Sequence, residues 1–207
     1  MSKVVLNVTM SLDGFMAGLD ISVEHPMGRG GLRLHEWILN TPTSDVDTTV
    51  AQEVTASTGS VVLGRRTFDV GVDVWQDTPH PVPCFVLTHN TRNRRVMKSG
   101  TFTFVTGGVK EALQEAKAVA GGKDVLLMGA DIAQQALSAG LLDEINLQIA
   151  PVLMGDGRRL FEHLGTERIE LERTRILASP HVTHLRFHVA QDQTTSAGAA
   201  PDQGVDG

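Results

Sequence analysis

The sequence predicts a single α/β domain built on a mixed, mostly parallel sheet flanked by helices. Short continuous apolar runs alternate with helical periodicity through most of the chain, as in a parallel sheet covered on both faces. Two strand patterns separated by a turn close the domain, which predicts antiparallel strands at its C-terminal end. We expect this domain to span residues 1–189.

Composition limits the class of protein. The chain has 207 residues, 41% of them hydrophobic, a formal net charge of -6 and one cysteine, Cys84. The length suits one domain, and a single cysteine excludes an internal disulfide. The acidic balance argues against a nucleic-acid or anionic-membrane surface. No apolar run is long enough to span a bilayer, and no signal peptide precedes the first strand pattern. We therefore expect a cytoplasmic protein with no nucleic-acid or membrane partner.

The predicted strands are continuous apolar runs or alternating patterns. They cover residues 4–8, 61–63, 84–87, 102–105, 125–128, 145–149, 168–177 and 182–189. Residues 178–181, with the sequence ASPH, predict the turn between the last two strands.

A first helix is expected between Ser44 and Gly59. Ser44 predicts an N-cap, and Asp47 stands where a capping box places its acidic residue. Valines four residues apart supply one apolar face, namely Val46, Val50 and Val54.

Two further helices are expected over residues 110–120 and 131–139, the second ending at Gly140. Residues 18–43 are polar and contain glycine and proline, which predicts a long irregular insertion. Residues 190–207 have little to bury and predict a disordered tail.

Three predicted strand ends carry groups that suit phosphate. The stretch VVLGRRTFDV turns at Gly64 into two arginines and a threonine, LTHN offers Thr88 and His89, and LLMGADIAQQAL turns at Gly129 into a helix N-terminus. Each stretch alone is equally consistent with an ordinary surface turn. Three in successive α/β units favour a dinucleotide, because ligands of such sheets bind where strands end and helices begin.

Other chemistries lack their motifs. No G-x-G-x-x-G follows a strand, and no G-x-S-x-G elbow of a hydrolase is present. Pro83-Cys84 has no second cysteine, so the zinc deaminase signature is absent and no metal site is expected.

Four stretches in this order carry a resemblance to a known family: TMSLDGFMAG, VVLGRRTFD, LLMGADIAQQAL and LLDEINLQIAPVLMGDGRRLF. Over residues 3–189 the chain resembles the dihydrofolate-reductase-like superfamily, and within it the reductase domain of riboflavin biosynthesis and its stand-alone relatives.

The resemblance implies a homodimeric, NADPH-binding fold. The paired arginines would suit the 2′-phosphate that distinguishes NADPH from NADH, and the segment from Phe15 to Ala17 would lie against the nicotinamide. The residues that the resemblance assigns to the cofactor are Thr9, Met16, Ala17, Gly64, Arg65, Arg66, Thr67, Thr88, His89, Met128, Gly129, Ala130, Asp131 and Ile132.

Two departures from the family pattern concern the binding sites. Ala130 stands where the family usually has a second glycine, so its Cβ is expected to crowd the diphosphate. Asp131 either places a carboxylate near the diphosphate or caps the helix. The resemblance implies that the substrate pocket is built where this chain has the insertion at 18–43. The identity of the substrate is therefore left open.

Three residues are candidates at the substrate end. Asp13 either acts in catalysis, by binding a substrate amine or amide or by relaying a proton, or forms an Asx-turn with Gly14. Trp37 either packs the insertion or stacks on a heterocycle. Gly155 belongs to a loop that is expected to help close the substrate end.

The expected function is an NADPH-dependent reductase of a small nitrogen heterocycle, of the 5-amino-6-(5-phosphoribosylamino)uracil reductase type. Dihydrofolate or another pterin is an alternative substrate, and a nucleotide-binding protein without turnover is a second alternative. A basic pocket floor would favour the phosphorylated pyrimidine. A carboxylate of the 44–58 helix facing the pocket would favour a pterin; the candidates are Asp45, Asp47 and Glu53.

Overall fold

The computed structural model describes residues 2–39, 43–166 and 168–190 of the chain. The helices are η1 (Gly31–His35), α1 (Glu36–Leu39), α2 (Asp45–Ser57), α3 (Arg65–Trp75), α4 (Gly108–Val119) and α5 (Ala130–Ser138). The strands are β1 (Val4–Ser11), β2 (Phe15–Ala17), β3 (Thr58–Gly64), β4 (Cys84–Leu87), β5 (Arg95–Val96), β6 (Thr101–Val105), β7 (Asp124–Met128), β8 (Glu144–Ala150), β9 (Arg158–Arg159), β10 (Leu171–Ala178) and β11 (Thr183–Val189).

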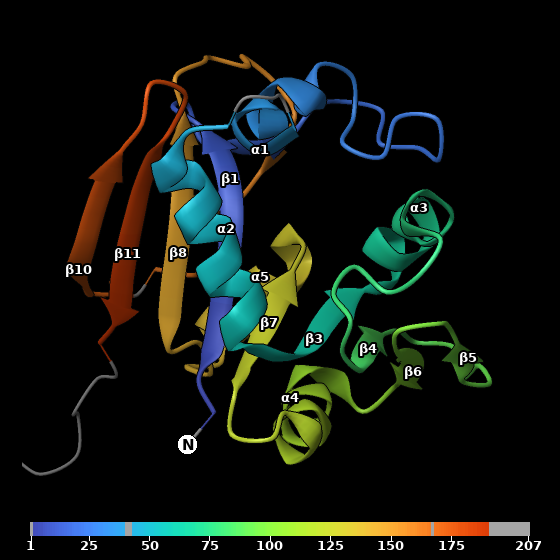
Figure 1. The fold of residues 1–207 in the computed structure, drawn as a ribbon. Coiled ribbons are helices and arrows are strands. Elements are labelled where there is room, and N and C mark those ends of the chain that lie inside the picture. Colours follow the sequence, from blue (N-terminus) through green and yellow to red (C-terminus); the bar gives the residue numbers. More distant parts are fainter. Residues whose placement is uncertain (1, 40–42, 167, 191–207) are drawn as a thin grey trace, which may run out of the picture.

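Nine of these strands form one sheet in the order β10-β11-β8-β1-β7-β3-β4-β6-β5 (Figure 1). Every neighbouring pair from β8 to β6 is parallel. The C-terminal strands β10 and β11 and the edge strand β5 pair antiparallel. The predicted mostly parallel sheet with antiparallel C-terminal strands is confirmed.

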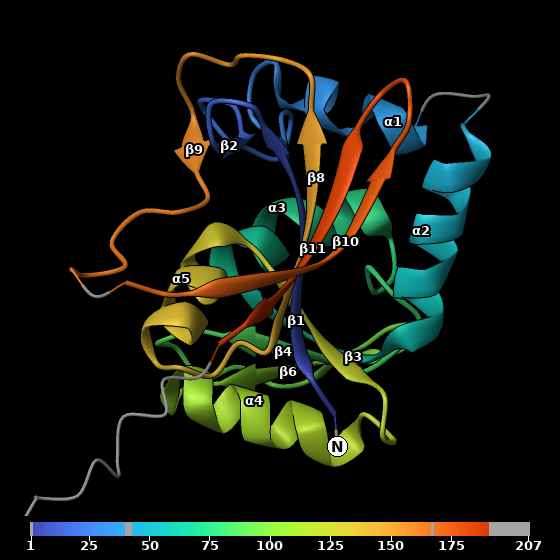
Figure 2. The ribbon, with the colours of Figure 1, turned by 90° about the vertical axis from the view of Figure 1, so that its left-hand side faces the viewer.

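Helices cover both faces of the sheet, as Figures 1 and 2 show together. On one face, Val61 and Leu63 of β3 belong to a buried cluster with Phe68 of α3. On the other face, Val62 of the same strand belongs to a cluster with Leu113 of α4 and with α5. Because side chains of a strand alternate between faces, a strand covered twice must be apolar throughout. This explains the continuous apolar runs in the sequence.

The N-terminus of α2 is capped as predicted, but by half of a capping box. The backbone N–H of Asp47 donates to Ser44 Oγ at 3.1 Å. The Asp47 carboxylate does not complete the box; it is fully buried and contacts His184 Nε2 at 2.7 Å. Asp47 therefore ties α2 to β11. At the end of α5, Gly140 adopts the predicted left-handed conformation, with φ 64°.

Several elements differ from the sequence prediction. Helix α3 was not predicted, and β2, β5 and β9 are too short to leave a pattern. Residues 18–43, predicted to be irregular, contain η1 and α1, which bury Leu34 and Trp37. The predicted disordered tail at 190–207 lies outside the described residues except for Ala190, which is exposed.

No helix in the described ranges is long and apolar enough to cross a membrane.

Replacement of the N-cap tests the local account of α2. Ser44→Ala removes the acceptor for the Asp47 N–H, and we expect a loss of about 1 kcal/mol in the free energy of unfolding. Chemical denaturation measures this loss. Ser57→Ala, at the exposed end of the same helix, is the control and should change stability by less than about 0.5 kcal/mol. Equal effects of the two substitutions would contradict the capping role.

Candidate functional site

Two strand-to-helix turns meet at the carboxyl edge of the sheet. Strands β3 and β7 are parallel neighbours, with Leu63 paired to Met128, so Gly64 and Gly129 leave the sheet side by side. Gly64 is the N-cap of α3 and Gly129 the N-cap of α5, and neither helix has a side-chain cap. The first N–H groups of both helices are therefore directed to one place, where the positive ends of two helix dipoles favour an anion.

The Gly129 turn is built so that only glycine fits. Gly129 has φ 105° and ψ 147°, a conformation essentially confined to glycine. A Cβ at this position would lie 2.8 Å from Thr67 Oγ1 in the first turn of α3. The Thr67 hydroxyl thus faces the bare backbone of the neighbouring turn. This cradle fits the phosphate groups that the sequence assigns to Gly64, Thr67 and Gly129.

The two residues after Gly129 behave differently from each other. Ala130 is 5% exposed, so its methyl group is covered by protein. The Asp131 carboxylate forms an ion pair with Arg158 of β9, and α5 has no side-chain cap. The capping role suggested for Asp131 is therefore not the one observed. Arg158 also pairs with Glu162 at 3.1 Å, so it joins the β9 loop to the start of α5. Ile132 is buried beneath the neighbouring turn, that of Gly64. Its Cγ1 would lie 3.5 Å from a Cβ added to Gly64.

The paired arginines have different surroundings. Arg65 Nε donates to Asp69 Oδ1 at 2.8 Å, one turn further along α3. Arg66 is exposed on the outer side of the helix. A phosphate bound by Arg65 would therefore have the Asp69 carboxylate nearby. Sequence reasoning missed this ion pair, although its i, i+4 spacing is typical of pairs on a helix.

The third predicted phosphate contact lies one strand away. Strand β4 is the parallel neighbour of β3, so Thr88 follows β4 at the same edge of the sheet. Thr88 is buried, and its Oγ1 accepts from the Asn90 N–H at 3.2 Å. His89 is exposed. The structure thus brings all three predicted turns to one edge.

Trp37 and Thr9 contact each other at the other end of the site. Trp37 Nε1 donates to Thr9 Oγ1 at 3.0 Å, and its ring meets His184 edge-on with centroids 5.2 Å apart. Trp37 is 7% exposed and Thr9 4%. These contacts favour the packing interpretation of Trp37. They also occupy the Thr9 hydroxyl, which was expected near the nicotinamide.

A buried polar cluster supports this tryptophan. Burial alone would raise the pKa of Asp47, but hydrogen bonds from His184 and Ser44 outweigh it, and the pKa is held below its usual value. The buried atoms Asp47 Oδ2, His184 Nδ1 and Gln148 Oε1 have no hydrogen-bond partner among the described residues. Sequence reasoning missed His184, because its contact with Asp47 joins residues 137 positions apart.

Asp13 anchors a distant loop. Its Oδ1 accepts from Ser11 Oγ at 2.6 Å and from the Met154 N–H at 3.0 Å, and its Oδ2 accepts from the Gly155 N–H at 2.8 Å. These bonds, that of Ser11 first, lower the pKa of Asp13 from 3.8 to about 2. The Asx-turn expected with Gly14 is replaced by this bridge, since the Phe15 N–H donates to Ser11 Oγ instead.

The predicted nicotinamide segment is a short strand beside that loop. Strand β2 pairs with β9, with Ala17 opposite Arg158. Ala17 is buried and Met16 half-buried. The Arg159 guanidinium lies over the Phe15 ring, 4.3 Å from its centroid.

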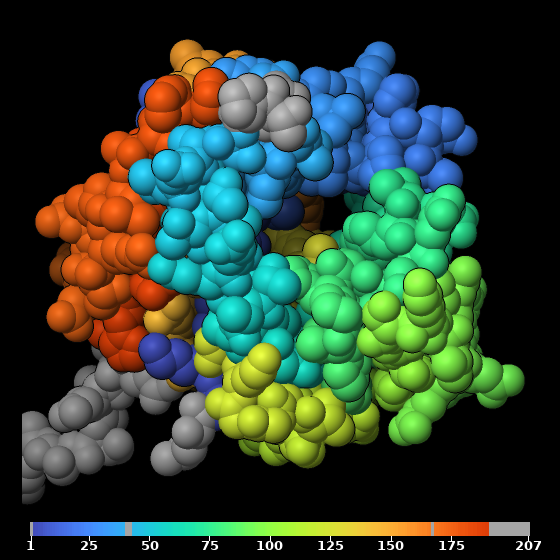
Figure 3. Space-filling view, viewed as in Figure 1, coloured from blue at the N-terminus to red at the C-terminus, as the bar shows by residue number. Residues whose placement is uncertain are grey.

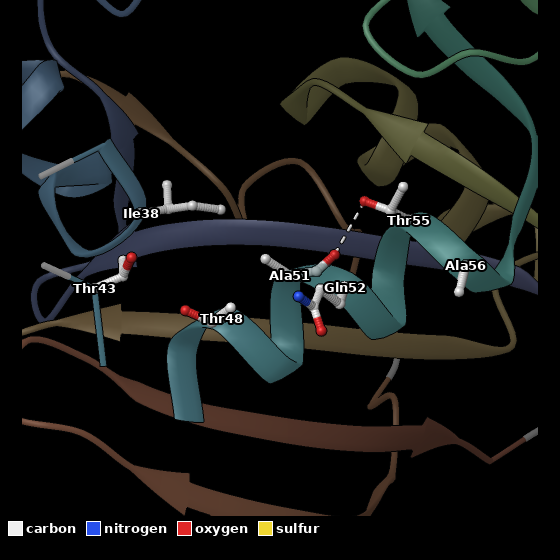
Figure 4. A pocket seen from close by; sticks show the side chains of 7 residues that line it. All are labelled: Ile38, Thr43, Thr48, Ala51, Gln52, Thr55 and Ala56. Carbon is white, nitrogen blue, oxygen red and sulfur yellow. Dashed lines mark hydrogen bonds between the residues drawn. The ribbon is translucent and has the colours of Figure 1, made fainter. Parts of the chain in front are cut away.

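A hollow separates α2 from α3. Figure 3 shows it between α2 in cyan and α3 in green, with yellow atoms of the β7–α5 region at its floor. A groove of about 410 Å³ runs along α2 (Figure 4). Its lining consists of Ile38, Thr43, Thr48, Ala51, Gln52, Thr55 and Ala56.

All residues that line the groove come from α2 and from the segment before it. Glu53 pairs with Arg175 of β10 and marks the opposite flank. Thr48, Ala51 and Thr55, at i, i+3 and i+7, therefore face away from the C-terminal strands. This helical spacing is visible in the sequence, but sequence reasoning considered only the charged residues of α2.

Comparison with known proteins identifies the family of the chain. The family model for the RibD C-terminal domain matches residues 2–185. The chain belongs to the RibD C-terminal domain family. This family is one of riboflavin-pathway pyrimidine reductases, and it points to an oxidoreductase. No curated protein matches the chain in sequence.

Solved structures share the fold of this chain. A protein from Shewanella sp. PV-4 assigned to riboflavin biosynthesis has a TM-score of 0.72 at 23% identity, over 92% of this chain and 99% of that one. A pyrimidine reductase-like protein from Corynebacterium diphtheriae has a TM-score of 0.62 at 15% identity, over 92% and 93%. The deaminase/5-amino-6-(5-phosphoribosylamino)uracil reductase of Thermotoga maritima has a TM-score of 0.60 at 10% identity, over 91% of this chain and 57% of that longer one.

Substitution of Gly129 tests the close approach of the two turns. Gly129→Ala adds a Cβ against Thr67 Oγ1 and forces an unfavourable φ, so we expect a loss of about 1–3 kcal/mol in the free energy of unfolding. Thr67→Ala in the same chain should recover part of this loss, because it removes the contact but not the backbone strain. Chemical denaturation of both variants measures the difference.

Gly140→Ala is the matched control, since Gly140 also has a positive φ but has no neighbour within 4 Å of the added Cβ. An equal loss at both glycines, with no recovery by Thr67→Ala, would show that the turns do not constrain each other.

Asp13→Asn tests the anchoring of the 152–155 loop. An amide keeps one oxygen but turns an NH2 group toward a backbone N–H, so one of the loop bonds is lost. We expect the amide hydrogens of Met154 and Gly155 to exchange faster with solvent, as measured by NMR. Unchanged exchange at both amides would contradict the anchoring role.

The same anchor has a predicted pH dependence. A carboxylate whose pKa falls on folding adds stability above its unfolded pKa, and that stability is lost as pH falls through the folded pKa. Protection of the two amides should therefore persist at pH 4 and decline toward pH 2. Loss of protection already near pH 5 would contradict it.

Proposed function

We propose that the chain is an NADPH-dependent reductase of a small nitrogen heterocycle. The observation that carries this proposal is the contact of two uncapped helix N-termini through Gly129 and Thr67 at the edge of the sheet. Such a cradle suits a diphosphate, and Arg65, beside it, suits a further phosphate.

Each part of the site has a role in this proposal. Gly64, Thr67 and the turn from Gly129 to Ile132 would hold the diphosphate, and Arg65 with Thr88 and His89 would hold the 2′-phosphate. When bound, the nicotinamide supplies the hydride. The segment from Phe15 to Ala17 would orient the ring and exclude water, and the packed Trp37 would support this end of the site.

The pterin alternative finds no support in α2. A carboxylate facing the groove would favour it, but Asp47 is buried against His184 and Glu53 pairs with Arg175. The groove-lining residues of α2 are uncharged. A pyrimidine therefore remains the better proposal, in agreement with the family.

Catalysis by Asp13 stays an alternative to anchoring. Its carboxylate already accepts three hydrogen bonds, and its lowered pKa keeps it charged at neutral pH. Such a group is a poor proton donor near neutral pH. We propose that Asp13 shapes the substrate end through Gly155 and the 152–155 loop.

Turnover tests the proposal directly. The full chain is mixed with NADPH and 5-amino-6-(5-phosphoribosylamino)uracil, and NADPH oxidation is followed by absorbance, with dihydrofolate in a parallel reaction. We expect oxidation with the aminouracil. Tight NADPH binding without oxidation of either mixture would favour a nucleotide-binding protein without turnover.

Cofactor choice gives a residue-level prediction. Arg65→Ala should weaken NADPH binding by roughly 1.5–3 kcal/mol, the range for hydrogen bonds to charged groups, and NADH binding much less. Asp69→Asn should keep NADPH binding at least as tight as in the parent, because it removes the carboxylate that competes for Arg65. Calorimetric titration measures the affinities of the parent and of both variants. Equal losses for both cofactors in Arg65→Ala would remove Arg65 from the 2′-phosphate site.

A further inference from the structure

A carboxylate stands at the turn that we propose for the diphosphate. Asp131 lies in the first turn of α5, and its side chain is exposed. The free N–H groups and the positive dipole end of this helix favour an anionic ligand, whereas an unpaired carboxylate beside them would repel it. The Asp131 carboxylate does not cap its own helix but forms an ion pair with Arg158 of β9. One guanidinium therefore neutralises the charge that would oppose a diphosphate.

The backbone that carries Arg158 is fixed on both sides. Arg158 is opposite Ala17 of β2, and a Cβ added to Gly157 would lie 2.2 Å from the Ala17 carbonyl oxygen. Leu160 is fully buried, and its carbonyl accepts from Gln134 Nε2 of α5 at 2.9 Å. Figure 2 shows β2 and β9 above α5. The fold itself thus places the Arg158 guanidinium at the first turn of α5.

Arg158 divides its guanidinium between two carboxylates. Nη1 pairs with Glu162 Oε1 at 3.1 Å, and Nη2 pairs with Asp131 Oδ1. The Glu162 side chain, in the same loop, is 27% exposed, whereas that of Asp131 is 63% exposed. An exposed ion pair contributes little to stability, because water and salt compete with it. Asp131 is therefore the partner that Arg158 can exchange at low cost, while Glu162 keeps the side chain in place.

A diphosphate at this turn would need a cation. Each of its phosphates carries a negative charge, and Arg65, the other arginine of the site, is shared with Asp69 and is proposed for a further phosphate. A guanidinium suits phosphate because it is planar and donates parallel hydrogen bonds. Arg158 can supply this cation without any movement of the backbone.

We propose that Arg158 binds the cofactor diphosphate and that Asp131 occupies its Nη2 group until then. On binding, Nη2 exchanges the Asp131 carboxylate for a phosphate oxygen, Nη1 stays with Glu162, and Asp131 turns to solvent. This inference rests on the proposed dinucleotide site and adds one residue to it. Because Arg158 is opposite Ala17, its cation lies between the diphosphate turn and the segment proposed for the nicotinamide.

A double-mutant cycle separates binding by Arg158 from mere neutralisation of Asp131. Calorimetric titration of the full chain with NADP⁺ compares the parent with Arg158→Gln, Asp131→Asn and the double variant. We expect Asp131→Asn to bind at least as tightly as the parent, since it removes the competing carboxylate. Arg158→Gln should weaken binding about tenfold or more in both backgrounds, as for a lost hydrogen bond to a charged group. A loss that disappears in the Asp131→Asn background would show that Arg158 only neutralises the carboxylate, and would overturn the inference.

Two further variants control for folding and for total charge. Arg158→Lys keeps a cation without the planar fork, so its affinity should lie between those of the parent and Arg158→Gln. Lys3→Gln removes a cation that pairs with Glu144 before β1, at the opposite edge of the sheet, and should change the affinity less than about twofold. Equal losses in Lys3→Gln and Arg158→Gln would show an effect of net charge alone and would contradict the inference.

Inorganic diphosphate separates this inference from the proposed function. It is titrated into the same proteins, and binding is followed by amide NMR at Asp131 and Arg158. If inorganic diphosphate binds with the expected dependence on Arg158 but NADP⁺ does not bind, the dinucleotide function fails and the role of Arg158 stands. If NADP⁺ binds equally well with and without Arg158, the function stands and the inference is wrong. Binding of neither compound would overturn both.

Discussion

The site depends on one close approach, that of the Gly129 backbone to Thr67. Two parallel strands deliver the turns side by side, but parallel pairing alone would leave room for a side chain between them. The positive φ of Gly129 and the 2.8 Å that would separate its Cβ from Thr67 Oγ1 fix how near the two helices begin. In the proposed site, the free N–H groups of both helices would act on one diphosphate.

The other end of the hollow is held by polar anchors between distant parts of the chain. Asp13 holds the 152–155 loop through two backbone N–H groups, and Trp37 fastens the insertion to β1 through Thr9. Asp47 and His184 bind α2 to β11 in the same region. Such contacts stabilise the fold because a buried polar group that loses its hydrogen-bond partner costs free energy.

The sequence predicted most strands of the sheet. Continuous apolar runs such as residues 61–63 and 125–128 identified strands covered on both faces, and the three phosphate-friendly turns do meet at one edge. Helix α3 was missed although Phe68, Val72 and Trp75 have helical spacing, because Gly71 and several β-branched residues obscure it. The Asp13, Trp37 and His184 contacts join positions from 28 to 142 residues apart, so no local pattern announces them.

The central claim is that the paired turns after β3 and β7 form the dinucleotide site. Backbone amide NMR of the full 22.3 kDa chain, recorded during titration with NADPH, tests it most directly. The account predicts that the largest shifts fall on Arg65 to Thr67 and on Gly129 to Ile132, with smaller ones at Thr88 and His89. Saturable binding with its largest shifts on β10, β11 or the groove face of α2, and none at Gly129, would contradict it.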